Sequence, residues 1–248
     1  MRYALQWLLS LLFVIQMYVA IVVIMLAYTP LALFNRAASL RWIKLYCRWV
    51  RWTARVMVGL HTEVRGPVPT GAVLIASKHQ SILDSVILTS VLPQPRFIMK
   101  KQLAWIPVAG WHGLRAGFVP VDRGKRGSAI KKMLADVNAG TRGPGQIIIY
   151  PQGTRTAPGV HLAYKKGTAA LYGQLEQPCI PVATNVGVFW PRHGIYRKPG
   201  VAVVEFLPAI PPGLPADAFM AALETSVESA SNRLMRDAGF VKAGFVKE

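Results

Sequence analysis

His79 and Asp84 form a pair that can carry out proton transfer. They lie five residues apart in the stretch HQSILD. A carboxylate bonded to one imidazole nitrogen fixes the tautomer and leaves the other nitrogen free to accept a proton, so this spacing predicts a general base. Ser81-x-x-Asp84 before an apolar run is also a capping-box pattern. In that alternative Asp84 serves only the start of a helix, and His79 is an ordinary loop histidine.

The elements on either side place this pair in a turn. The apolar run of residues 73–77 predicts a buried strand that leads directly to His79. Ser81 is then the expected N-cap of a helix that continues to Pro93. Open α/β sheets place their ligand sites at the carboxyl ends of strands. We therefore expect the His79 turn to lie at the functional edge of a sheet.

Two later turns carry basic residues and glycines after predicted strands. The sequence DRGKR occupies residues 122–126, and PQGTR occupies residues 151–155, followed by KKG at 165–167. Glycine lets backbone amides approach an oxyanion, and arginine matches the geometry of a phosphate. If the strands run parallel to the strand before His79, these turns form a phosphate-sized positive pocket beside it. Taken singly, each turn is equally well explained as a solvated basic loop.

Strand and helix patterns alternate through the rest of the chain. Predicted strands cover residues 96–99, 118–121, 146–150, 180–183 and 201–204, and predicted helices cover residues 106–114, 128–138, 167–175 and 217–237. The alternation predicts an α/β fold with a mostly parallel or mixed central sheet flanked by helices. We expect an N-terminal membrane-embedded and amphipathic two-helix segment over residues 1–62 and an α/β domain over residues 63–248.

The N-terminal segment has the composition of a membrane helix. Aliphatic and aromatic residues dominate residues 5–33, and no charged residue lies between Arg2 and Arg36. About 20 such residues span a bilayer, and the run is too long for a secretory signal, which is the alternative. We expect a membrane helix or an inserted hairpin that stops at Pro30. The excess of positive residues after it predicts that the remaining chain faces the cytoplasm at the cytoplasmic membrane.

A second helix of a different kind is predicted over residues 39–60. Its basic residues form one stripe, and three tryptophans accompany them: Arg41, Lys44, Arg48, Arg51, Arg55, Trp42, Trp49 and Trp52. Cationic and aromatic side chains together are typical of a membrane interface, so we expect this helix to lie on anionic lipid headgroups. The alternative is the solvated face of an ordinary globular helix.

Charge and cysteine content narrow the class of protein. The chain of 248 residues has 29 basic and 11 acidic residues, a formal net charge of +18 that implies an anionic partner. Nucleic acid is disfavoured, because no stacking motif or reading helix is evident and the charge lies beside membrane-type sequence. Two cysteines suggest neither a disulfide framework nor a zinc site, and no metal is expected. No G-x-S-x-G or Walker motif occurs either.

Four short motifs of this chain, taken in their order along the sequence, resemble the conserved blocks of the 1-acyl-sn-glycerol-3-phosphate acyltransferase family. HQSILD resembles the H-x4-D block of that family, and PQGTR at 151–155 resembles its E-G-T-R block. GFVPVDR at 117–123 is similar to the second block, with Arg123 in place, and IPVA at 180–183 is similar to the closing one. The matches cover residues 78–185, and the stretch from Lys101 to Pro107 also resembles the family sequence.

The resemblance implies acyl transfer from a thioester, on coenzyme A or acyl carrier protein, to the free hydroxyl of lysophosphatidate. His79 would be the base and Asp84 its partner, and no cofactor other than the acyl donor is needed. Membrane lipids are the other expected partners. The residues implied to bind substrate are Arg123, Gln152, Gly153, Thr154 and Arg155, with Lys101 and Lys166 as further candidates.

The sequence departs from the family pattern at two positions. Lys78 stands where asparagine usually precedes the histidine, and Gln152 stands where the third block carries glutamate. The second position is associated with the glycerol acceptor, so another lysolipid, such as a lyso-aminolipid, is an alternative acceptor. A different alternative is a protein that keeps the fold but only binds anionic lipid.

Overall fold

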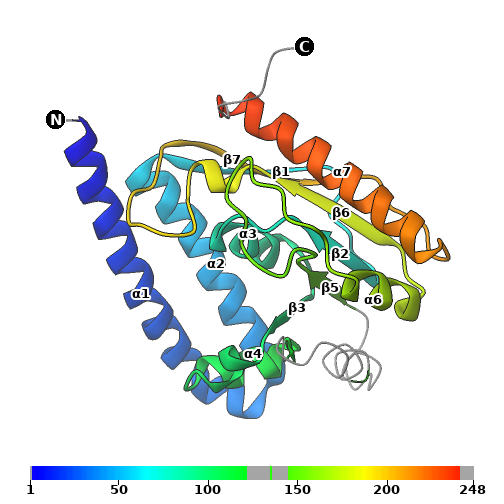
Figure 1. The fold of residues 1–248 in the computed structure, drawn as a ribbon. Helices are drawn as coiled ribbons and strands as arrows, with labels where there is room; N and C mark the ends of the chain where they lie inside the picture. The colour runs from blue at the N-terminus through cyan, green and yellow to red at the C-terminus, as the bar shows by residue number, and fades with distance from the viewer. Residues whose placement is uncertain (1, 122–134, 136–144, 241–248) are drawn as a thin grey trace.

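The structure, a computed structural model, describes residues 2–121, 135 and 145–240 (Figure 1). In chain order its elements are α1 (Arg2–Phe34), α2 (Arg36–Val58), β1 (Leu60–Arg65), β2 (Val73–Ser77), α3 (Ile82–Val91), β3 (Pro95–Lys100), the 3-10 helix η1 (Lys101–Trp105), α4 (Ala109–Ala116), β4 (Val119–Val121), β5 (Gln146–Ile149), α6 (Gly167–Leu175), β6 (Cys179–Thr184), the 3-10 helix η2 (Val186–Val188), β7 (Gly200–Phe206) and α7 (Ala216–Asp237). The expected alternation of strands and helices is present.

Seven strands form one mixed sheet in the order β1-β7-β6-β2-β5-β3-β4. Neighbouring strands are parallel except β6 and β7, which are antiparallel. The predicted fold class is confirmed, although β1 was not among the predicted strands. Strand β2 lies in the middle, where Ile75 pairs with Ile148 of β5 and Ile180 of β6. Because β2 is covered on both faces, all five of its residues are buried.

The two faces of the sheet pack against different helices. Val73 and Ile75 join a core with side chains of α1, α2 and α3, whereas Leu74 and Ala76 pack with side chains of α6 and α7. This alternation follows from the two-residue period of a strand. In Figure 1 helix α7 crosses one face, α2 and α3 lie on the other, and α1 lies outside α2. The end of β2 is therefore held between two packed layers.

Helices α1 and α2 form a hairpin that turns at Asn35. Helix α1 continues through Pro30 to Phe34, so the prediction that the helix stops at Pro30 is wrong. A proline removes only one backbone donor, and here that loss does not end the helix. The Asn35 side chain instead accepts a hydrogen bond from the Ala37 amide at 2.9 Å and caps α2. The chain reverses where the second helix is capped.

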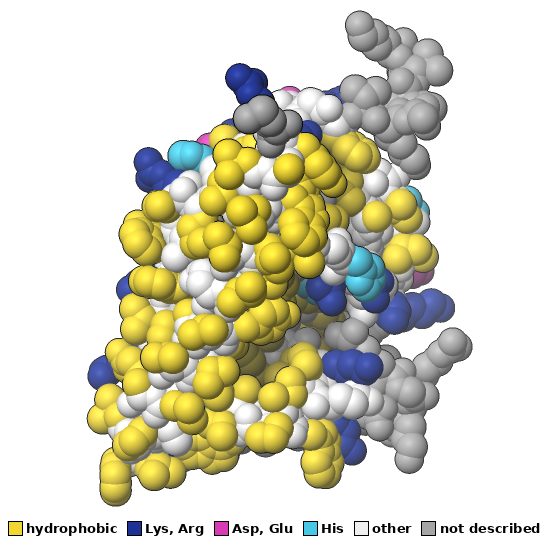
Figure 2. Space-filling model, turned by 90° about the vertical axis from the view of Figure 1, so that its left-hand side faces the viewer, with side chains coloured by type: hydrophobic (Ala, Val, Ile, Leu, Met, Phe, Trp, Pro, Cys, Tyr) yellow, Lys and Arg dark blue, Asp and Glu magenta, His cyan; other side chains and the backbone are white. Residues whose placement is uncertain are grey.

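Polar side chains of α1 face the rest of the protein together with Phe13, whereas most of its other apolar side chains face outward. Gln6 Nε2 donates to the carbonyl oxygens of Val58 and Arg197, and Gln16 Nε2 donates to Thr53 Oγ1 at 3.0 Å. Figure 2 shows hydrophobic side chains covering the face on this side, with lysines and arginines mainly along its margins. Helix α1 is long and apolar enough to cross a membrane. Its uncovered apolar surface indicates membrane association.

Helix α2 is built into the core along one face. Cys47, Val50 and Ala54 are buried there, at spacings of three and four residues that keep them on one side of the helix. Trp42 is only 3% exposed, and its ring lies edge-on to His112 with centroids 5.1 Å apart. The expectation that Trp42 lies at a membrane interface is therefore wrong, because helix α4 covers it. Trp49 and Trp52, by contrast, are exposed.

Two other expectations concern the middle of the chain. The helix expected over residues 106–114 begins only at Ala109, because Val108 adopts a left-handed φ of 59° directly before it. The turn at 122–126 and, apart from residue 135, the helix expected over 128–138 lie outside the described residues. The expected division of the chain after residue 62 stays a prediction.

Candidate active site

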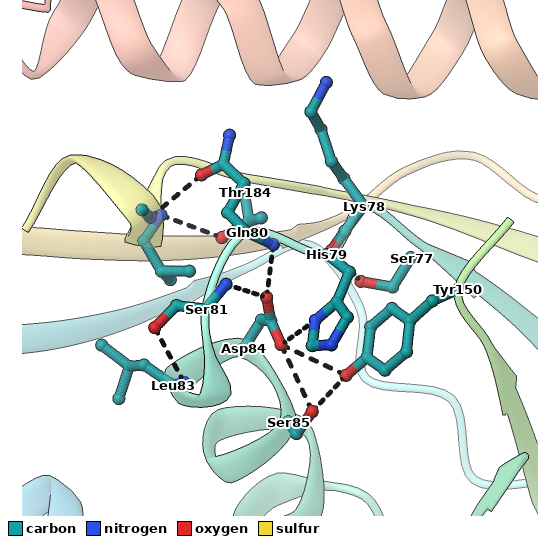
Figure 3. Close-up of polar contacts among 12 residues, drawn as sticks. Ser77, Lys78, His79, Gln80, Ser81, Leu83, Asp84, Ser85, Tyr150 and Thr184 are labelled. Carbon is teal, nitrogen blue, oxygen red and sulfur yellow. Dashed lines mark hydrogen bonds and ion pairs between the residues drawn. The ribbon is translucent and has the colours of Figure 1, made fainter. Parts of the chain in front are cut away.

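The turn between β2 and α3 brings His79 against Asp84 (Figure 3). His79 Nδ1 lies 2.9 Å from Asp84 Oδ1. Asp84 is fully buried, whereas the His79 side chain is 16% exposed. Within the described part of the chain, the other ring nitrogen, Nε2, has no hydrogen-bond partner. A buried carboxylate on Nδ1 orients the ring and leaves Nε2 to accept a proton from a bound substrate.

The second oxygen of Asp84 caps helix α3. Asp84 Oδ2 accepts hydrogen bonds from the Gln80 amide at 2.8 Å and the Ser81 amide at 2.9 Å. Ser81 Oγ in turn accepts from the Leu83 amide, which completes the capping box. The carboxylate therefore holds His79 with one oxygen and the start of α3 with the other. The two chemical interpretations of this motif are compatible, because they use different atoms.

Tyr150 completes the surroundings of the His79 ring. The two rings stack with centroids 3.8 Å apart and an interplanar angle of 13°. The Tyr150 hydroxyl donates to Asp84 Oδ1 at 3.3 Å and lies 2.6 Å from Ser85 Oγ. Burial and the nearby Asp84 carboxylate raise the pKa of Tyr150, so its hydroxyl stays protonated and able to donate. Sequence reasoning missed this role, although Tyr150 directly follows the strong apolar run of β5.

The basic turn after β5 meets the His79 turn, as the parallel pairing of β2 and β5 requires. The Thr156 amide donates to the His79 carbonyl at 2.7 Å. Gly153 has a positive φ of 69°, a conformation that favours glycine. A β-carbon at this position would lie 2.7 Å from Lys165 Nζ, so a cationic side chain closes over the glycine. Thr154 and Arg155 are half-buried beside it.

A partly buried carboxylate on α7, that of Glu228, joins the segments that form the site. Lys78, which is 1% exposed, forms an ion pair with Glu228 Oε2. Glu228 Oε1 accepts from Gln152 Nε2 at 3.3 Å and from the Tyr164 hydroxyl at 3.0 Å. In Figure 3 Lys78 points toward α7, and the His79 ring points the opposite way, toward Asp84. The two departures from the family pattern, Lys78 and Gln152, thus share one partner.

Glu228 is a site residue that sequence reasoning missed. It lies 150 residues from Lys78 along the chain, so no local motif links the two. Its pairing explains how a lysine can be buried next to His79, because a buried cation requires a compensating carboxylate. The Gln152 Oε1 atom is buried and has no hydrogen-bond partner among the described residues. That carbonyl oxygen is therefore an acceptor that the described chain does not use.

The remaining predicted substrate-binding residues are not gathered as closely. Lys101 is exposed in η1, after β3, which is two strands away from β2 in the sheet. Lys166 is exposed directly before α6. Arg123 lies outside the described residues. The structure therefore brings together His79, Asp84, Lys78 and the turn of residues 151–155.

Comparison with known proteins identifies the class. A family model described as Acyltransferase matches residues 61–185, which is half of the chain and includes both turns of the site. The chain belongs to this acyltransferase family. Its relatives include the 1-acyl-sn-glycerol-3-phosphate acyltransferase of Pseudomonas aeruginosa, which is 29% identical over 170 residues covering 68% of this chain and 66% of that protein. The human 1-acyl-sn-glycerol-3-phosphate acyltransferase beta is 32% identical over 169 residues, covering 66% of this chain and 60% of that protein.

A solved structure shares the fold over nearly the whole chain. The crystal structure of PlsC, the 1-acyl-sn-glycerophosphate acyltransferase of Thermotoga maritima, superposes with a TM-score of 0.73 at 20% identity. The match covers 98% of this chain and 100% of the PlsC chain. The chain thus matches 60–66% of the length of these two curated relatives and all of a solved one. Among the described residues, no group of three or more histidines, cysteines or carboxylates is placed to hold a metal ion.

Proposed function

We propose that the protein transfers an acyl group from a thioester to the sn-2 hydroxyl of lysophosphatidate and so makes phosphatidate. The observation that carries this proposal is the His79–Asp84 contact of 2.9 Å at a strand end, beside a basic turn. Relatives named for this reaction support it. The geometry supplies a base for the hydroxyl and cations for the phosphate.

In this mechanism His79 Nε2 takes the proton of the acceptor hydroxyl as its oxygen attacks the thioester carbonyl carbon. Asp84 stabilises the imidazolium that forms, because its buried carboxylate lies on Nδ1. The C–S bond of the tetrahedral intermediate then breaks, and the thiolate leaves. His79 returns its proton to the sulfur, and the new ester bond remains on the glycerol. Protons and electron pairs balance without a covalent enzyme intermediate.

The phosphate of the acceptor would bind to the basic turn. Arg155 would supply a planar fork, Thr154 would supply donors, and Arg123 would add a second guanidinium. The Gly153 amide already donates to the Tyr150 carbonyl at 2.8 Å, so Gly153 would contribute by letting the turn approach the phosphate closely. Gln152 differs from these residues, because its amide nitrogen already donates to Glu228 and its free carbonyl would accept from a glycerol hydroxyl. A lyso-aminolipid is the alternative acceptor, because the carboxylate of Glu228 lies beside this amide.

The acyl donor would be acyl-coenzyme A or acyl carrier protein. Both are anionic, and the +18 net charge suits either. The α1–α2 hairpin would hold the protein on the cytoplasmic membrane with the sheet on the cytoplasmic side, since the positive residues follow the apolar helix. Lysolipid and acyl-chain substrates would then enter from the lipid surface.

The test is an acyl-transfer assay with purified full-length protein and a panel of lysolipids. The wild type should acylate lysophosphatidate with a kcat/KM at least tenfold above that for a lyso-aminolipid. His79→Ala should lower kcat by about 100-fold or more, the usual contribution of a general base. The conservative Arg155→Lys should impair lysophosphatidate more than an uncharged monoacylglycerol, because only the former has a phosphate for the fork.

Two results would contradict the proposal. Near-normal turnover by His79→Ala would exclude the base mechanism. No acyl transfer to any lysolipid from either donor, by protein that still binds anionic vesicles, would favour the non-catalytic lipid-binding alternative. A preference for the lyso-aminolipid would keep the acyltransferase chemistry and change the acceptor.

A further inference from the structure

A second cationic site lies away from His79, between α2 and β1. It is a pocket of about 260 Å³ lined by Arg48, Arg51, Trp52, Arg55, His61 and Thr62. Arg51 connects it to α3 through Ser90 at the C-terminal end of that helix, whereas Asp84 lies in the first turn of α3. The pocket and the proposed catalytic site are thus at opposite ends of one helix. None of the residues assigned to acyl transfer lines this pocket.

Within residues 2–121 and 145–240, the guanidinium groups of this pocket have no acidic partner. Arg51 Nε donates to Thr62 Oγ1, and its other nitrogens donate to the Ser90 hydroxyl and the Thr62 carbonyl, all of which are neutral acceptors. Among the residues that the structure describes, Arg48, Arg51 and Arg55 form no ion pair. Glu63 is adjacent in sequence, but its carboxylate pairs with Arg65. Three positive charges on successive turns of α2 therefore have no carboxylate partner in the part of the chain that the structure describes.

The position of the pocket on α2 identifies the kind of anion. Helix α2 has an exposed apolar stripe made of Leu45, Trp49, Trp52 and Val56. At about 100° per residue, this stripe lies between the basic stripe and the side of α2 that packs on α1. The apolar stripe is therefore continuous with the outward apolar surface of α1, which Figure 2 shows, and the arginines border it. Cations that border a membrane-facing apolar surface lie at the depth of lipid phosphates.

We propose that this pocket binds the phosphate group of an anionic membrane lipid that is not the substrate. One phosphate would accept charge-assisted hydrogen bonds from Arg48 and Arg55 while Arg51 stays fixed by Thr62 and Ser90. The Trp52 ring, 56% exposed, would lie beside the glycerol and upper acyl chain. The bound lipid would fix the depth and rotation of the α1–α2 hairpin, which general attraction between a basic surface and a charged bilayer does not do.

Matched substitutions on α2 distinguish a site from general electrostatics. Arg41, Arg48 and Arg55 are exposed and seven residues apart, so they lie on one side of the helix, but Arg41 does not line the pocket. Full-length protein would be titrated with phosphatidylcholine vesicles, with and without phosphatidylglycerol, at constant ionic strength. Phosphatidylglycerol carries a phosphate but no free hydroxyl at sn-2, so it probes the pocket rather than the acyl-acceptor site.

Arg41→Gln should weaken binding to the phosphatidylglycerol vesicles by about fivefold or less, the effect of one surface cation. Arg48→Gln and Arg55→Gln should each weaken it by about 10- to 100-fold, the effect of losing a hydrogen bond to a charged group. The pocket variants should bind phosphatidylcholine vesicles as the wild type does. Equal losses in all three variants would overturn the proposal, because the arginines would then act only through surface charge.

A second measurement separates lipid phosphate from free phosphate. Inorganic phosphate, matched in ionic strength with chloride, should change the Tm of lipid-free wild type and lipid-free Arg48→Gln equally, because any binding at the 151–155 turn is common to both. A phosphate-dependent rise in Tm in the wild type that is lost in Arg48→Gln would assign the pocket to the free ion and overturn the lipid assignment. All variants should keep the wild-type Tm in chloride, since Arg48 and Arg55 are exposed and make no hydrogen bonds to the described chain.

Discussion

Lys78 and Gln152 both contact the carboxylate of Glu228. Moving that carboxylate from position 228 to position 152 tests whether this cluster requires one negative charge and no more. Gln152→Glu alone would place a second carboxylate about where Gln152 Nε2 now lies 3.3 Å from Glu228 Oε1. Two charges at that distance repel by about 5 kcal/mol at an effective dielectric constant near 20. Lys78 offsets part of this repulsion. Alternatively, the pair can take up a proton, which costs at most about 3.7 kcal/mol at pH 7 for an ordinary glutamate.

Gln152→Glu should therefore lower the free energy of unfolding by about 2–4 kcal/mol at pH 7, and by less than about 2 kcal/mol at pH 5.5, where proton uptake is easier. Glu228→Gln should cost about 3–5 kcal/mol, because Lys78 is 1% exposed and loses its carboxylate. The double variant restores one carboxylate to the cluster. Its loss of unfolding free energy should be smaller than the sum of the two single losses by at least about 2 kcal/mol.

The measurement is Tm by circular dichroism at one scan rate, at pH 7 and pH 5.5, for the four proteins of the cycle. For a chain of this size each kcal/mol corresponds to about 2–4 °C. Acyl transfer to lysophosphatidate at a temperature where all four are folded shows whether the moved carboxylate keeps the acceptor in place. If the stability losses of the two single variants add up to that of the double variant within about 0.5 kcal/mol, the two positions are not coupled and the reasoning is refuted.

Three further predictions concern the His79 surroundings and His112. Asp84→Asn should lower both kcat and Tm, whereas Ser81→Ala, which loses only the cap, should cost about 1 kcal/mol of stability and leave kcat within a few-fold; equal kcat losses would contradict this division. Tyr150→Phe keeps the stack and removes the hydroxyl, so kcat should fall about tenfold or less, with a stability change near 1 kcal/mol by denaturant titration. Burial lowers the pKa of His112 below its ordinary value of 6.5, so its contribution to stability is present above that pH and lost as pH falls; Tm should drop between pH 7 and pH 5, and His112→Gln should flatten that slope.

The sequence alone determined the local parts of the site. The strand over residues 73–77 is observed with its predicted bounds, and helix α3 begins at Ile82 after the predicted Ser81 cap, because both signals depend on neighbours in the chain. The helix ends at Val91, two residues before Pro93, to which it was expected to continue. The order of strands and helices likewise predicts a sheet in which the 151–155 turn meets His79, since parallel strands end at one edge. The spacing of His79 and Asp84 predicts two roles for Asp84, as the partner of His79 and as the cap of the following helix. Both could be predicted because each depends on residues within five positions along the chain.

Only the tertiary structure decided which groups meet across long separations. Tyr150 stacks on His79 from a neighbouring strand, and Glu228 reaches Lys78 and Gln152 from the last helix. No periodicity or motif encodes these contacts, because they depend on how α7 and the strands pack. The burial of Trp42 under α4 also depends on packing. Its residue type predicts a position at a membrane interface, but tertiary contacts with α4 place it in the core. An aromatic side chain that is suited to a membrane interface is buried in the core instead when tertiary contacts remove more of its apolar surface from water.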